Sequence, residues 1–225
     1  MKFRILLPLL LTLAALLVQF TPSAPLLFEF NREALAHGEY WRFLTGHLVH
    51  FNTSHLIWDV GTLCLLAALL PSLSVGGWLR LLGGAAAVIS AGVWFLAPQL
   101  EFYRGLSGLD CALFGAAVTG FVVRAFRERD YPLLAVALLA GFGFLAKCQW
   151  ELQQGSTLFA QSAGSFVPVP LAHLLGAVWG AISITIDVCC GKLRDSPSAS
   201  SRHSLTHAVA EGGTRPPGAL MVREF

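Results

Sequence analysis

Two side chains in this sequence could act as a nucleophile and its base. Ser107 lies in the stretch Arg104-Gly-Leu-Ser-Gly-Leu-Asp110, and His173 lies in Pro170-Leu-Ala-His-Leu-Leu-Gly176. A serine hydroxyl is almost fully protonated at neutral pH, so it attacks a carbonyl only when a neighbouring imidazole removes its proton. We therefore expect Ser107 to be the nucleophile and His173 the base, if the fold brings them together.

The composition indicates which kind of fold must position this pair. The chain has 225 residues, of which 55% are hydrophobic and only 12% are charged, too few charges to coat a soluble protein of this size. A helix that spans a bilayer needs about 17–25 mostly apolar residues. We predict an all-α membrane protein with six transmembrane helices, at Phe3–Phe20, Leu56–Leu73, Trp78–Ala97, Leu106–Val123, Tyr131–Ala146 and Leu171–Cys190.

The rest of the chain is assigned around these spans. Residues 1–190 are predicted to form one transmembrane domain, with an interfacial loop at 21–54 that is rich in aromatic and charged side chains. Residues 147–170 are expected to form an outer loop. Residues 191–225 are rich in Ser, Pro, Gly and charge, which predicts a disordered cytoplasmic tail.

The distribution of basic residues predicts the orientation. Short cytoplasmic loops carry an excess of Lys and Arg, and a cytoplasmic amino terminus places most of them on that side. The residues counted there are Lys2, Arg4, Arg80, Arg124, Arg127, Arg129, Lys192 and Arg194. The second, fourth and sixth spans then all begin at the outer face, so Ser107 and His173 are expected at the same depth.

Further polar residues begin the second span. Ionisable groups in a bilayer are costly and commonly mark function, so His55 and Asp59 are expected to support the site, since residues four apart share a helix face. The free amide of Ser107 at a helix start could bind a developing oxyanion, and Gly105 and Gly108 would leave room for the substrate.

Other interpretations of the polar residues stay open. His47, His50 and His55 with Asp59 could bind zinc, but no His-Glu-x-x-His pattern supplies ligands and a base together. We expect no metal and no other cofactor. We also expect no nucleic-acid partner, because basic residues are not interleaved with exposed aromatics. Trp41 and Arg42 are expected to anchor the loop. Three residues after the fifth predicted span either shape substrate access or form a polar cap: Lys147, Trp150 and Glu151.

These motifs resemble those of the rhomboid intramembrane serine proteases. Gly105-Leu-Ser107-Gly108 is similar to the family's nucleophile motif, and Ala172-His173-Leu-Leu-Gly176 to its base helix. The first loop and second helix are similar as well, at Trp41-Arg42 and at His47-Leu-Val-His50-Phe-Asn-Thr-Ser-His55. The resemblance covers residues 38–180 and implies a six-helix bundle with a Ser107–His173 dyad.

A narrower resemblance is to the rhombosortase subgroup, carried by residues 38–50 and 145–151. It implies an enzyme of the bacterial inner membrane, active near the periplasmic side, that removes the carboxy-terminal Gly-Gly-type sorting tail of secreted proteins. Such substrates and the membrane lipids are the partners implied. The alternative within the same fold is a non-catalytic relative that binds transmembrane helices without cutting them.

One position departs from the family pattern. The family has asparagine four residues after the histidine of the second helix, both as oxyanion donors, whereas here His55 is followed by Asp59. A carboxylate would repel an oxyanion. Either Asp59 is protonated and donates, or it orients His55 and leaves donation to the histidine and the backbone.

Overall fold

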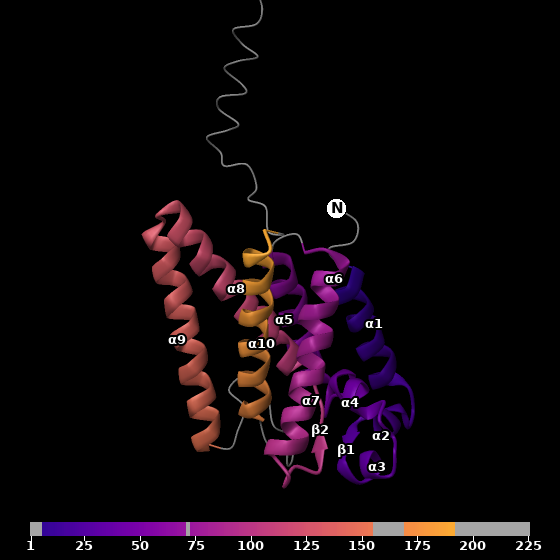
Figure 1. Ribbon diagram of the computed structural model, residues 1–225. Coiled ribbons are helices and arrows are strands. Elements are labelled where there is room, and N and C mark those ends of the chain that lie inside the picture. Colours follow the sequence, from indigo (N-terminus) through magenta and orange to yellow (C-terminus); the bar gives the residue numbers. More distant parts are fainter. Residues whose placement is uncertain (1–5, 71–72, 155–168, 192–225) are drawn as a thin grey trace, which may run out of the picture. The chain divides into compact units, whose positions relative to one another are not determined.

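A computed structural model describes residues 6–70, 73–154 and 169–191. Apolar helices lie at all the predicted positions (Figure 1). They are α1 (Leu6–Phe20), α5 (Thr53–Leu69), the continuous helical segment Val75–Leu96, α8 (Ser107–Glu128), α9 (Tyr131–Gln154) and α10 (Pro170–Cys189). The segment Val75–Leu96 consists of α6 (Val75–Trp78), the π-helical segment η2 (Leu79–Gly83) and α7 (Gly84–Leu96).

Four of these helices are long and apolar enough to cross a membrane: Val75–Leu96, α8, α9 and α10, with 20 to 24 residues each. The apolar helices α1 and α5 are shorter, at 15 and 17 residues. The chain is therefore a mostly helical protein whose long apolar helices fit a multi-pass membrane protein.

The helix boundaries differ from the sequence prediction at one place that matters for the site. The fifth span was expected to end at Ala146 and to be followed by an outer loop, but α9 continues to Gln154. That prediction was wrong because the last two turns carry polar residues, which lower the hydropathy without interrupting the helix. Residues 155–168 of the expected loop and, apart from Gly191, the expected tail lie outside the described residues.

Capping residues explain where two of the site helices begin. Asn52 is the N-cap of α5, and its side chain accepts a hydrogen bond from the amide of His55 at 2.8 Å, which satisfies one of the free amides of the first turn. Pro170 stands in the first turn of α10, where the missing N–H costs nothing.

The predicted interfacial loop is itself folded, into short helices and a strand. It contains α2 (Ala24–Phe28), β1 (Phe30–Asn31), α3 (Arg32–Ala36), α4 (Arg42–Thr45) and the 3₁₀ turn η1 (Gly46–Leu48). Strand β1 pairs antiparallel with β2 (Phe102–Tyr103), which leads directly into α8. The loop is thus joined by backbone hydrogen bonds to the segment that carries Ser107.

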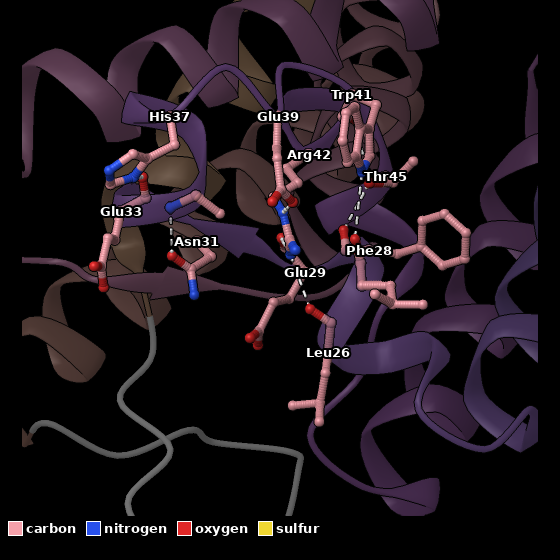
Figure 2. A network of polar contacts seen from close by, with 12 residues as sticks. Leu26, Phe28, Glu29, Asn31, Glu33, His37, Glu39, Trp41, Arg42 and Thr45 are labelled. Carbon is pink, nitrogen blue, oxygen red and sulfur yellow. Dashed lines mark hydrogen bonds and ion pairs between the residues drawn. The ribbon is translucent and has the colours of Figure 1, made fainter.

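Arg42 holds this folded loop together (Figure 2). Its guanidinium is buried, donates to the carbonyls of Leu26 at 2.9 Å and Glu29 at 3.0 Å, and pairs with Glu39. Trp41 beside it is exposed, and its indole N–H donates to the Leu27 carbonyl. Arg42 therefore has an internal structural role, whereas the exposed ring of Trp41 is free to reach the membrane boundary.

Helix α10 shares the most extensive helix contact of the bundle with α8, and it also packs against α7 and α9 (Figure 1). Away from Ser107, the buried Asp187 of α10 pairs with Arg80 of η2, and Arg80 Nε also donates to the Ser183 hydroxyl. Trp179 Nε1 donates to the Arg80 carbonyl at 3.0 Å. A charge buried among apolar helices needs such partners.

Candidate active site

Ser107 and His173 meet in the structure. Ser107 is the first residue of α8 and His173 lies in the first turn of α10. Ser107 Oγ is 3.1 Å from His173 Nε2, and the histidine is only 7% exposed. This distance is within the range at which a base can take the proton of a nucleophile.

Glycines on the two helices make this approach possible. A Cβ atom added at Gly176 would lie 2.1 Å from the Gly108 carbonyl oxygen, and one added at Gly180 would lie 1.9 Å from that of Ala112. Gly115 of α8 is as close to the Ala177 backbone. These glycines let the two backbones approach closely, whereas a Cβ added at Gly120 of α8 would meet nothing within 4 Å.

The turn before Ser107 is fixed by contacts with the folded loop and α5. Gly105 has φ +124°, a conformation that favours glycine, and its amide donates to the Gly46 carbonyl at 3.3 Å. A Cβ on Gly105 would lie 2.9 Å from His55 Cε1, and one on Gly108 would lie 2.9 Å from the Tyr103 hydroxyl. The space beside these glycines is filled by the protein's own side chains, so packing explains them without the substrate room expected from the sequence.

Arg104 joins the same turn to the folded loop. Its Nε donates to the buried Glu29 carboxylate at 2.7 Å, and its guanidinium lies 5.0 Å from the centre of the Phe51 ring. Because Arg104 directly precedes Gly105, this ion pair fixes the direction in which the chain enters α8.

Asp59 lies between two histidines. Its Oδ2 is 3.2 Å from His50 Nε2 and 3.3 Å from His55 Nε2, and all three side chains are buried. The amide of Leu106 donates to His50 Nε2 at 3.4 Å. Asp59 Oδ2 therefore faces both imidazoles, and the cluster reaches the Ser107 turn through His50.

His47 does not join this cluster. Its Nε2 lies 3.1 Å from the Ser90 hydroxyl and 3.3 Å from the Ala86 carbonyl, both on α7. Burial lowers the pKa of His47 to about 4, against the opposing effect of backbone hydrogen bonds to Ala86 and Gly105. Within residues 6–70, 73–154 and 169–191, no group of three or more His, Cys, Asp or Glu side chains is arranged to hold a metal ion.

The sequence did not assign Glu151 to the catalytic pair, yet it lies beside His173. Glu151 Oε2 is 3.4 Å from His173 Nδ1, the ring nitrogen that faces away from Ser107. Lys147 Nζ, one turn earlier on α9, is 2.8 Å from the same carboxylate oxygen. A signal was available, because an ionisable residue close to an apolar span is a functional candidate, but the predicted end of the fifth span left Glu151 in a loop.

A cavity of about 510 Å³ opens next to the pair. It lies between α5, α8 and α9, and residues from all three helices line it together with His173. Its lining includes His55, Asp59, Ser107, Asp110, Phe114, Phe144, Lys147 and Glu151. Most of the lining is apolar, and the polar groups gather where Ser107 and His173 stand.

Comparison with protein-family models and with curated proteins gives no match.

Proposed function

We propose that this chain is an intramembrane serine endopeptidase of the rhomboid type, most similar to a rhombosortase. The observation that carries the proposal is the 3.1 Å approach of Ser107 Oγ to His173 Nε2, at the beginning of two apolar helices. A serine and a histidine in apolar helices commonly serve packing. Here a close-packed glycine interface holds them at reacting distance beside a cavity.

The reaction follows from this arrangement. His173 Nε2 takes the Ser107 proton while Oγ attacks a peptide carbonyl, and the resulting imidazolium then gives the proton to the leaving amine as the C–N bond breaks. The product is an acyl-enzyme and a released carboxy-terminal fragment. Water, deprotonated by His173, hydrolyses the ester and restores both side chains.

Backbone amides are the best-placed donors for the oxyanion. The first amides of α8, beginning at Ser107, have no carbonyl four residues earlier in the helix and lie at the positive end of its dipole. Asp59 is close to the Nε2 atoms of His50 and His55, so we assign it the orientation of these rings. Of the two histidines, His55 lines the cavity and is the candidate side-chain donor.

The apolar cavity suits a peptide segment leaving a membrane helix. A helical peptide hides its carbonyls in internal hydrogen bonds, and glycine costs a helix about 1 kcal/mol relative to alanine. A Gly-Gly pair would therefore help to present an extended segment to Ser107. On this basis we propose as substrates secreted proteins with a carboxy-terminal Gly-Gly-type sorting tail, cut near the periplasmic side of a bacterial inner membrane.

The test is co-expression of the full chain with a secreted reporter that carries a Gly-Gly motif and a hydrophobic tail. Intact mass spectrometry of the reporter measures tail removal by the wild type, Ser107→Ala and His173→Ala. Thr185→Val and His37→Ala serve as matched controls, since Thr185 bonds only within its own helix and His37 is exposed. We expect processing by the wild type and the controls alone.

Equal processing by all five forms would overturn the assignment of the pair. A wild type that neither processes the reporter nor reacts with a fluorophosphonate at Ser107 would instead favour the helix-binding alternative.

A further inference from the structure

The arrangement around His173 continues past the imidazole to a carboxylate on a third helix. Glu151 is 2% exposed, and its Oε2 lies 3.4 Å from His173 Nδ1. The opposite ring nitrogen, Nε2, faces Ser107 at 3.1 Å. Hydroxyl, imidazole and carboxylate therefore lie in series, one each from α8, α10 and α9.

We propose that Glu151 is a positioning residue for His173, so that the site works as a Ser107–His173–Glu151 triad instead of a dyad. This rests on the proposed function. A neutral imidazole carries one N–H, and His173 can accept the Ser107 proton only if that hydrogen is on Nδ1. A carboxylate facing Nδ1 selects this tautomer, holds the ring plane and faces the positive imidazolium formed during attack.

Lys147 explains how a carboxylate can be held there. Its Nζ lies 2.8 Å from Glu151 Oε2, and its side chain is 22% exposed, so it offsets the buried charge while remaining in partial contact with the surroundings. The order Lys then Glu, four residues apart, is the less favourable one for an isolated helix. Local helix stability therefore gives no reason for the pair, whereas the position of His173 does.

The 3.4 Å separation is long for a hydrogen bond, and the Nδ1 atom of His173 meets no other hydrogen-bond partner in the described part of the chain. Catalytic hydrogen bonds are commonly long in the empty enzyme and shorten when substrate is bound. We therefore expect the distance between Glu151 Oε2 and His173 Nδ1 to shorten when substrate is bound.

The decisive experiment compares Glu151→Gln, Glu151→Asp and the matched control Glu128→Gln in purified full-length enzyme with the Gly-Gly reporter. Glu128 also pairs with a basic residue four positions away, but on an exposed surface of α8. We expect Glu151→Gln to lower kcat by about 10- to 1,000-fold with KM changed less than about twofold. Glu151→Asp should retain more activity, and Glu128→Gln should match the wild type.

An unchanged kcat in Glu151→Gln would overturn the proposal. The proposal would also be overturned if Glu151→Gln and Glu151→Asp lost the same kcat and the same Tm, because that result would indicate a structural ion pair. A second measurement does not depend on cleavage. The proton NMR spectrum of the wild type should contain a downfield imidazole N–H signal that His173→Ala removes and Glu151→Gln shifts.

The two measurements separate this proposal from the proposed function. A wild type that shows the signal but does not cleave refutes the protease and leaves the pairing supported. A wild type that cleaves without a Glu151-dependent signal refutes the triad alone.

Discussion

At the scale of single residues, the role of Asp59 bears on how the proposed enzyme would bind an oxyanion. Asp59 Oδ2 is nearly equidistant from the Nε2 atoms of His50 and His55, so it is close enough to influence both rings. The sequence left the choice open between a protonated donor and an orienting group. We propose the orienting role, because Asp59 Oδ2 lies close to both imidazole nitrogens.

Replacement of Asp59 by asparagine tests this assignment. An amide removes the charge that faces the two imidazole nitrogens, and an interaction with a charged group contributes roughly 1.5–3 kcal/mol. We expect Asp59→Asn to lower kcat/KM by about 10- to 100-fold, measured with the Gly-Gly reporter. Asp130→Asn is the control, because Asp130 only accepts from the Leu133 amide at a helix start, which asparagine also does. Full activity in Asp59→Asn would favour the protonated donor.

His47 links the folded loop to α7 and predicts a dependence of stability on pH. Its pKa is about 4 when folded and about 6.5 when unfolded. Between these values the unfolded chain binds a proton that the folded chain excludes, so the free energy of unfolding is highest above pH 6.5 and falls as the pH falls toward 4. The full difference is about 3 kcal/mol.

Thermal unfolding in detergent at pH 7.5 and pH 4.5 measures this effect. The loss of Tm at the lower pH should be smaller in His47→Gln than in the wild type. His37→Gln, which changes an exposed histidine, should show the wild-type loss. An identical loss in all three proteins would assign the acid sensitivity to other groups.

At the scale of elements, the contact between α8 and α10 brings Ser107 and His173 together. Three glycines in that contact stand against backbone of the facing helix: Gly115, Gly176 and Gly180. At these positions the helices cannot accept even one methyl group without moving apart. Movement there changes the distance between Ser107 and His173, because both side chains lie at the ends of these helices.

Gly180→Ala and Gly120→Ala form a matched pair for this contact. The first places a Cβ 1.9 Å from the Ala112 carbonyl oxygen, and the second meets nothing within 4 Å. We expect Gly180→Ala to cost about 1–3 kcal/mol or more and to abolish most activity. Gly120→Ala should leave activity unchanged and stabilise α8 by up to about 1 kcal/mol. Thermal unfolding and reporter cleavage measure both, and equal Tm values would contradict the packing argument.

At the scale of the whole molecule, the orientation in the membrane remains a prediction from the basic residues. Two single cysteines, introduced into a variant without native cysteines, test it. Gln99→Cys lies between α7 and β2, near the Ser107 end of the described bundle, and Arg127→Cys lies in the last turn of α8. Spheroplasts treated with a membrane-impermeant maleimide should label the first and not the second until they are lysed. Labelling in the reverse order would place the candidate site on the cytoplasmic side.

The sequence allowed prediction of Ser107 and His173 because each stands in a local pattern at the start of an apolar helix, with glycines one helical turn apart on His173's own helix. Such signals depend on neighbours in the chain. The position of Glu151 depends on the rotation of α9 against α10, which no local pattern encodes. The folded loop was likewise predicted only as interfacial, because the contacts of Arg42 join carbonyls 13 and 16 residues away.

The sparse burial of α9 has a consequence for how the proposed protease could be held inactive. Only 11% of its apolar window is buried, against 39% for α8 and for α10, so α9 is held to its neighbours more loosely than they are to each other. Glu151 travels with it. An outward movement of α9 would separate the Glu151 carboxylate from His173 while Ser107 and His173 stay together. The proposed nucleophile and base would then lack the group that aligns them until α9 packs against a bound substrate.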